Sequence, residues 1–239
     1  FMFVPIQLLG ITLFTFIMVR LLPGDPATVI AGPFSTPDSI RAIHHSLGLD
    51  QPIYVQYLYY LRNLVHGDLG YAWYTSNPVA SDLASRFPAT LELITVTLFF
   101  SIVLGIPIGV ATALRKGGIL DKSTFAYGMF AGAVPDFWLG LLFIFFLYYT
   151  VPIFPPPIGR LDPNITLHTI TGMVIPDSIL TQNWDALRSG LMHLVLPVAT
   201  LWFVYTPGVV KITRSTMDEM LGSRFIYYAE ASGLPRVQV

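Results

Sequence analysis

Long apolar runs with almost no charged side chains dominate the chain. Three of them, residues 1–19, 93–114 and 189–210, carry no charge at all, and 123–151 is interrupted only at Pro135-Asp136. About 20 apolar residues in a helix span the roughly 30 Å hydrocarbon layer of a bilayer. No run alternates apolar and polar residues, and each exceeds the roughly 9–11 residues of a barrel strand. The pattern predicts four transmembrane helices.

The segments between these runs are more polar and predict structure outside the lipid. In 23–87, Pro37-Asp38 marks a helix start, and a short apolar face follows that ends at Gly48. A tyrosine-rich helical stretch runs from about Ile53 to His66 and stops at Gly67. These features predict a small helical cap. Residues 152–188 contain Pro152, Pro155, Pro156 and Pro157 and predict an irregular loop.

Composition supports a membrane protein and excludes several other classes. Hydrophobic residues make up 54% of the 239 and charged residues 11%, whereas about a quarter of the residues in a soluble domain are charged. The fold class is therefore an all-α integral membrane protein, a polytopic helical bundle. A net charge of −1 gives no basic excess for nucleic acid. The absence of cysteine excludes disulfides, thiolate metal sites and a cysteine nucleophile.

The positions of lysine and arginine predict the orientation. Arg115, Lys116 and Lys122 crowd one short connection, and further basic residues follow the last span. Short loops rich in Lys and Arg lie in the cytoplasm. We therefore expect 115–122 and 214–239 inside the cell, and 23–87 and 152–188 outside it.

Two glycine pairs lie within the predicted spans, Gly105 with Gly109 and Gly128 with Gly132. Glycines four residues apart let two helices approach closely in a membrane. The sequence leaves two interpretations open, which are packing within this chain and a seam with a partner subunit.

Two carboxylates lie in or near the spans. Asp136 sits about halfway along the third run, where an ionised side chain is costly and must face protein or water. It has either a structural role or a place on a transport path. Glu92 lies one turn inside the second span, and we expect it to reach the membrane interface.

Other candidate sites are unconvincing. The chain has no Walker A sequence, so it has no recognisable phosphate cradle of its own. His44 and His45 are adjacent and so face different sides of a helix, which favours surface histidines over a metal site. Ser189, His193 and Asp185 could supply a hydrolase triad, but no GxSxG motif accompanies them.

The residues after the last span predict an apolar helix in the aqueous cytoplasm. Helical sequence runs from Met217 through Ser232, with Phe225, Tyr227 and Tyr228 too apolar for a free tail. An aromatic helix presented to the cytoplasm is typical of a segment that binds in a partner's groove.

Taken together, the sequence resembles the permease subunits of ATP-binding-cassette importers of the dipeptide, oligopeptide and nickel branch, the binding-protein-dependent inner membrane components. The resemblance covers nearly the whole chain, and its short motifs occur in a shared order. They are Arg20-Leu21-Leu22-Pro23-Gly24-Asp25-Pro26, Leu47-Gly48-Leu49-Asp50-Gln51-Pro52, Gln56-Tyr57-Leu58, Gly67-Asp68-Leu69-Gly70, Pro88-Ala89-Thr90-Leu91-Glu92-Leu93, Gly105-Ile106-Pro107-Ile108-Gly109, Pro135-Asp136-Phe137-Trp138-Leu139-Gly140-Leu141-Leu142 and Thr213-Arg214-Ser215-Thr216-Met217.

The resemblance implies a division of the chain and a coupling loop. Residues 1–22 are the first span, 23–87 the extracytoplasmic cap and 88–239 the permease core. In the core, the spans lie at about 88–114, 123–151 and 189–213, the outer loop at 152–188 and the coupling segment at 214–239. Such permeases usually have two further spans, so we expect six in the intact protein. The residues that match the loop contacting the ATPase are Ala229, Glu230, Ala231, Gly233 and Leu234.

The resemblance also implies partners. We expect a second, homologous permease, two ATPase subunits that bind ATP and magnesium, and an extracytoplasmic substrate-binding protein. This chain itself would bind no cofactor, hold no metal and catalyse no reaction, and it would lie in the cytoplasmic membrane. Peptide is the default substrate, with nickel or oligosaccharides as alternatives. Two other classes compete: a channel or ion-coupled carrier without ATPases, and a membrane enzyme, for which the spans carry too few His, Asp and Glu residues.

Overall fold

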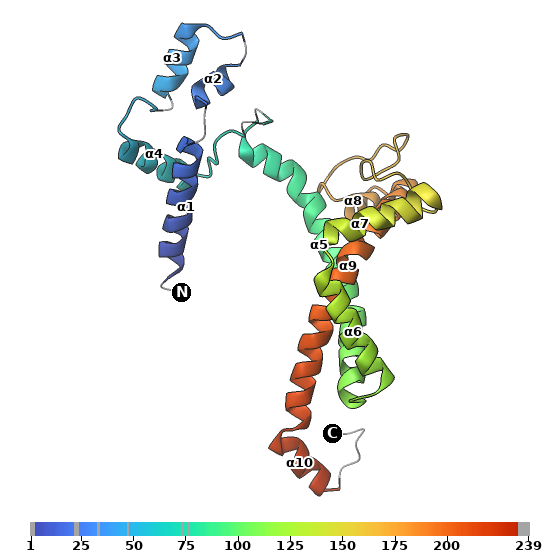
Figure 1. Ribbon diagram of the computed structural model, residues 1–239. Coiled ribbons are helices and arrows are strands. Elements are labelled where there is room, and N and C mark those ends of the chain that lie inside the picture. Colours follow the sequence, from blue (N-terminus) through green and yellow to red (C-terminus); the bar gives the residue numbers. More distant parts are fainter. Residues whose placement is uncertain are drawn as a thin grey trace. The chain divides into compact units, whose positions relative to one another are not determined.

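The computed structural model describes residues 3–21, 24–32, 34–46, 48–72, 74–75 and 77–233, and helices dominate it (Figure 1). In these ranges the only β-pairing is an isolated bridge between Tyr71 and Pro78. The chain divides into two compact units, 1–87 and 88–239. The elements are α1 (Val4–Leu21), α2 (Pro26–Ala31), α3 (Pro37–Ser46), α4 (Ile53–Val65), α5 (Val79–Leu114), α6 (Ile119–Ala133), α7 (Asp136–Ile144), the π-helix η1 (Phe145–Thr150), α8 (Val174–Leu180), α9 (Trp184–Leu221) and α10 (Arg224–Ala231).

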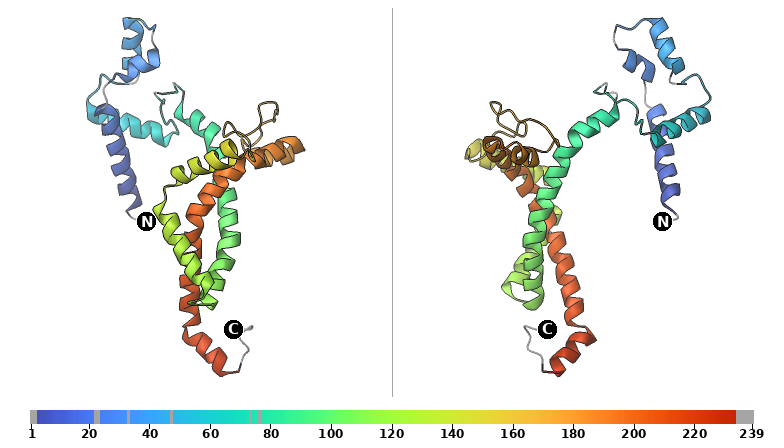
Figure 2. Two further views of the ribbon diagram at one scale, coloured as in Figure 1. Left: turned by 45° about the vertical axis from the view of Figure 1, so that its right-hand side comes forward. Right: turned by 180° about the vertical axis from the view of Figure 1, so that it is seen from behind.

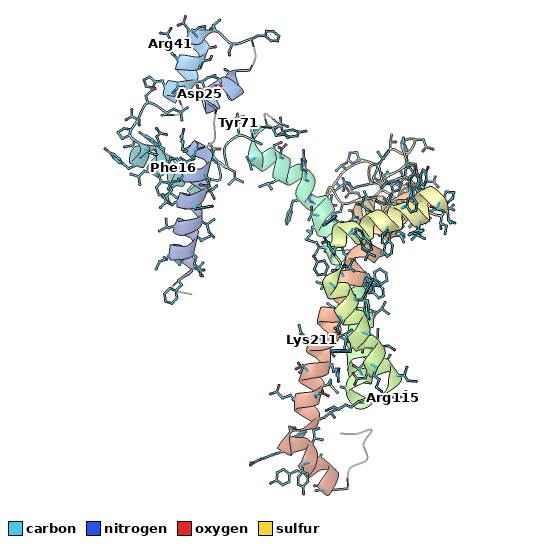
Figure 3. The ribbon with its side chains drawn as sticks, viewed as in Figure 1. Phe16, Asp25, Arg41, Tyr71, Arg115 and Lys211 are labelled. Carbon is cyan, nitrogen blue, oxygen red and sulfur yellow. The ribbon has the colours of Figure 1, made fainter. Side chains whose placement is uncertain are left out.

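The first unit joins the apolar helix α1 to the small helices of the predicted cap. Phe16 is the buried residue of α1, and its ring lies 5.4 Å from that of Tyr57 and 5.8 Å from that of Tyr60, both on α4 (Figure 3). The Tyr57 hydroxyl donates to the Leu9 carbonyl at 3.2 Å. Tyr57 and Tyr60 therefore pack α4 against α1.

Asp25 organises the other end of the cap. Its Oδ1 accepts the backbone N–H of Ala27 at 3.0 Å, which caps α2, a short helix that the sequence did not predict. The same oxygen lies 3.0 Å from Nε2 of His44 on α3. No cluster of three metal-binding side chains occurs within the described ranges, and His44 instead links α3 to α2.

The second unit is built around α9, which packs against α6, α7 and α8 (Figure 2). Helix α5 runs beside α9, and the buried Ser101 and Thr206 hydroxyls meet between them at 3.0 Å. At 1.5 Å per residue, the 36 residues of α5 and the 38 of α9 are each about 55 Å long. Both helices therefore extend beyond a 30 Å hydrocarbon layer.

Helices α1, α5 and α9 are long and apolar enough to cross a membrane. Helix α6 and the α7–η1 pair pass the same test only together, and they bend by 96° at their junction. The bend coincides with the predicted interruption, because Pro135 has no N–H and forces Val134 into an extended conformation. The all-α polytopic fold is confirmed, with four spans if the bent pair counts as one.

Two predicted boundaries were wrong. Residues 152–188 are irregular only to Met173, because α8 follows and α9 begins at Trp184, where the Asn183 side chain accepts the Ala186 N–H at 3.0 Å. The helix predicted from Met217 through Ser232 is divided, since α9 ends at Leu221 and α10 starts after Gly222-Ser223.

Candidate functional site

A cavity of about 490 Å³ lies between α7, α9 and the proline-rich residues 155–157. Its wall is largely apolar, and Asp136 and His193 are its two ionisable side chains. The antiparallel approach of α7 and α9 creates it: Gly140 faces Thr200, and one turn earlier on α7 Asp136 meets Tyr205. Asp136, the candidate path residue of the sequence analysis, therefore lines an apolar cavity of the second unit.

Asp136 holds its place at the first turn of α7 through two contacts. Its Oδ1 accepts the backbone N–H of Phe137 at 2.8 Å, and its Oδ2 accepts the Tyr205 hydroxyl at 3.3 Å. Across the described residues, no Lys, Arg or His lies within ion-pair distance of this carboxylate. Within the part of the chain that the structure describes, the Asp136 carboxylate therefore has no cationic partner.

A polar cluster joins His193 and Ser189, near the start of α9, to Asp162 of the irregular segment that precedes α8. The His193 Nδ1 lies 2.9 Å from the Ser189 carbonyl, which can only accept, so Nδ1 carries the hydrogen. The Ser189 hydroxyl donates to Asp162 Oδ2 at 2.7 Å and accepts the Asp162 N–H at 2.9 Å. The imidazole Nε2 is buried 3.9 Å from Asp162 Oδ1.

This arrangement is not that of a hydrolase. A nucleophilic serine donates its hydroxyl hydrogen to a histidine base, whereas Ser189 donates to Asp162. Asp185, the third residue considered from the sequence, is exposed, and sequence reasoning missed Asp162 because it lies 27 residues before Ser189. The cluster fastens the outer loop to α9.

Glu92 contradicts the expectation that it reaches the interface. Its side chain is buried, with only 4% of the residue exposed, and its two oxygens accept the N–H groups of Val174, at 3.0 Å, and Ile175. The first N–H groups of a helix have no partner within the helix, and a carboxylate stabilises that end. Glu92 on α5 therefore caps α8.

The two glycine pairs lie in different surroundings. A Cβ atom at Gly105 would lie 3.0 Å from Val209, and one at Gly109 would lie 2.6 Å from Thr213, so this pair packs against α9 of the same chain. A Cβ atom at Gly128 would lie 3.6 Å from the side chain of Pro207, which is an ordinary contact distance. A Cβ atom at Gly132 would have open space around it. A partner seam at Gly132 stays a prediction.

Two ion pairs connect the α5–α6 loop region to the far end of α9. Arg214 reaches Asp121 twice, with Nη1 2.7 Å from Oδ1 and Nη2 3.1 Å from Oδ2, and Asp121 also accepts the Gly117 N–H at 2.9 Å. Lys116 Nζ lies 3.1 Å from Asp218 Oδ1. Residues 214 and 218 are one helical turn apart, so both pairs form on the same face of α9. The sequence analysis did not predict this contact.

Helix α10 carries most of the residues matched to the coupling loop. Phe225, Tyr227 and Tyr228 are 75%, 70% and 66% exposed, an unusual density of aromatic surface on eight residues. Ala229 is half-buried, Glu230 lies on the same helix and Ala231 is exposed. Gly233 adopts a left-handed φ of +81° with open space around it. Leu234 lies outside the described residues.

Two family models match the chain. Residues 2–94 match the N-terminal region of the binding-protein-dependent transport system membrane components, and 105–239 match the binding-protein-dependent transport system inner membrane component.

Curated relatives match over almost the whole chain. The probable D,D-dipeptide transport system permease protein DdpB of Escherichia coli K12 is 40% identical over 95% of this chain and 66% of its own length. The dipeptide permease DppB of the same strain is 33% identical over 97% and 69%, and the di/tripeptide permease DppB of Pseudomonas aeruginosa UCBPP-PA14 is 34% identical over 96% and 68%.

This chain spans about two thirds of the length of these relatives. Its several apolar helices fit the inner-membrane location that the family description gives. The resemblance read from the ordered motifs is confirmed: the chain belongs to the family of binding-protein-dependent transport system inner membrane components, and it is a multi-pass protein of the cytoplasmic membrane.

Proposed function

We propose that this chain is the permease subunit of an ATP-driven importer of short peptides, and that it forms half of the translocation path. The observation that carries the proposal is the aromatic surface of α10, presented directly after the longest apolar helix. The relatives named above are peptide permeases, which supports peptides over nickel or oligosaccharides as substrates.

Helix α10 is the segment that contacts an ATPase subunit. Three exposed aromatic side chains on one short helix are poorly solvated in water and fit a groove of a partner. The ATP and magnesium belong to that partner, and this chain transmits the conformational change. Nucleotide-dependent closure of two ATPase subunits drives the change because the two states of the permease bind them with different affinity.

The two ion pairs give α10 a route to the spans. A displacement of α10 pulls on the last turns of α9, which Asp121 and Lys116 hold to the start of α6. Helix α6 ends at the bend before Asp136, beside the cavity. In the assembled importer, a second permease completes the path, and a binding protein delivers the substrate to the outer side, where the cap 23–87 lies.

The test begins with the full-length protein, which we would purify from its native membrane in mild detergent and analyse by mass spectrometry. The expected companions are a second permease and ATPase subunits. Proteoliposomes containing that complex and the binding protein should then take up a radiolabelled dipeptide only with ATP. Recovery of this chain alone, or uptake driven by an ion gradient without ATP, would contradict the proposal.

Variants localise the coupling. Replacing both Phe225 and Tyr228 by serine should prevent ATPase binding, while the matched replacement of the exposed cap residues Tyr54 and Tyr59 should leave it intact. Gly233→Trp should abolish uptake without affecting membrane insertion. Gly67→Trp is its control, because Gly67 has a nearly identical φ of +82° and equally open surroundings. Normal uptake by the Gly233 variant would disprove the assignment of the coupling loop.

A further inference from the structure

We propose that the cavity beside Asp136 is a binding site for the protonated amino group of the substrate, which in a peptide is its amino-terminal residue. The inference rests on the proposed function and adds to it which end of the peptide this chain contacts. Three observations carry it. Asp136 has no cationic partner among the described residues, the donor side chains of the cavity wall already have acceptors, and the cavity volume suits a short peptide.

The carboxylate is the first observation. Asp136 lies at a bend between two apolar segments, where charged side chains are costly and mark ion or substrate paths. Its contacts with Phe137 N–H and the Tyr205 hydroxyl leave lone pairs unused, because a carboxylate offers about four acceptor positions. An ammonium group is the complementary ligand: it supplies the missing positive charge and up to three hydrogen bonds.

The second observation is that the side chains of the wall have no donor left for an anion. The cavity lining contains no Lys or Arg. Its two donor side chains already donate to backbone carbonyls, His193 through Nδ1 to Ser189 at 2.9 Å and Thr200 to Leu196 at 2.9 Å. A carboxylate in this place would lose its hydration without gaining a charged partner. The wall therefore selects the amino end of a peptide against its carboxyl end.

The third observation is the size and the apolar character of the rest of the cavity. About 490 Å³ falls within the 300–1,000 Å³ of typical small-molecule sites. The wall follows α9 from Met192 to Leu201, a rise of about 13 Å. Two extended residues are about 7 Å long. Leu93, Phe137, Ile144 and Leu196 line the remaining space and would surround an apolar first side chain.

A photoreactive dipeptide tests the site directly. The probe is p-benzoyl-phenylalanyl-alanine, whose benzophenone lies on the amino-terminal residue, applied to the purified importer without binding protein or ATP. We expect mass spectrometry to place the cross-links on 136–144 and 192–201. Asp136→Asn should reduce labelling about tenfold, equivalent to ~1.4 kcal/mol, and Asp136→Glu should retain part of it. The amino-acetylated probe should label the wild-type protein as weakly as the free probe labels the asparagine variant.

The matched control is Asp185→Asn, which removes an exposed carboxylate from the first turn of α9 and should leave labelling unchanged. Equal labelling of the wild-type and Asp136→Asn proteins, or equal labelling by the acetylated probe, would overturn the inference. ATP-dependent dipeptide uptake by the wild-type complex is measured separately, because its absence would overturn the proposed function instead.

Discussion

Glu92 of α5 accepts the backbone N–H of Val174 at 3.0 Å, across 82 residues of sequence, and also that of Ile175. A side chain of one long helix thus completes the start of a short one in the outer segment. Helix α8 has only seven residues and no cap from its own preceding residue. Because so short a helix is unstable alone, Glu92 fixes where the outer segment folds against α5.

Replacing Glu92 by glutamine should loosen α8 without unfolding the bundle. The amide has one acceptor oxygen, so one N–H of α8 stays buried and unpaired, at a cost of about 1–3 kcal/mol. Hydrogen exchange in lipid nanodiscs should become at least about fivefold faster over 174–180. Glu219→Gln, at an exposed position on α9, is the control. Unchanged exchange in the Glu92 variant would show that the contact contributes nothing to stability.

Asp177 makes the outer segment sensitive to acid. The residue is 1% exposed and accepts hydrogen bonds from the Thr171 hydroxyl and from the backbone N–H groups of Ile170, Thr171 and Gly172. Burial alone raises the pKa of this carboxyl, but the hydrogen bonds outweigh it, and the pKa lies below its usual value.

A lowered pKa fixes the sign of the pH dependence. An unfolded aspartate titrates near about pH 3.9, so the stabilisation by Asp177 is complete above that pH and is lost as the pH falls through the lower native value. Melting temperatures of the wild type and Asp177→Asn should differ most at pH 6 and converge towards pH 3. A difference that grows on acidification would contradict this assignment.

The pair between Asp121 and Arg214 should respond to charge reversal. Asp121→Arg or Arg214→Asp alone places like charges together at a largely buried position and should lower the melting temperature in detergent. The double exchange should recover part of the loss, but not all of it, because an arginine at 121 cannot accept the Gly117 N–H. Lys211→Asp, at an exposed position on α9, is the control. Additive losses in the double variant would argue against a direct pair.

The α5–α9 seam should tolerate no side chain at Gly109. A Cβ there would lie 2.6 Å from Thr213, so Gly109→Leu should force the helices apart at a cost of about 1–3 kcal/mol. Gly208 lies on α9, and apart from its chain neighbours and the nearby backbone of α9 no atom lies within 4 Å of its Cβ position, so Gly208→Leu should be nearly neutral. Thermal unfolding in detergent separates the two, and equal melting temperatures would refute the close contact.

The helical spans of this protein can be predicted from the sequence because they depend on local properties of the chain, which are hydrophobicity and the positions of proline. The apolar runs required helices of membrane length, and Pro135 broke the third run whatever surrounded it, because proline has no N–H at any position. The ordered motifs also identified the family. The coupling residues, by contrast, came only from resemblance, and their contacts with an ATPase stay a prediction.

The partners of the polar side chains, by contrast, are decided only by the tertiary structure. Four carboxylates look alike in the sequence but have different roles in the structure. Glu92 caps a helix and Asp121 pairs with Arg214. Asp162 accepts the Ser189 hydroxyl, and Asp177 accepts hydrogen bonds from the turn that precedes it. Three of these contacts join residues 27 to 93 positions apart. Hydrophobic periodicity fixes which face of a helix is buried, but a hydrogen bond needs atoms about 3 Å apart, and only the folded chain determines that distance.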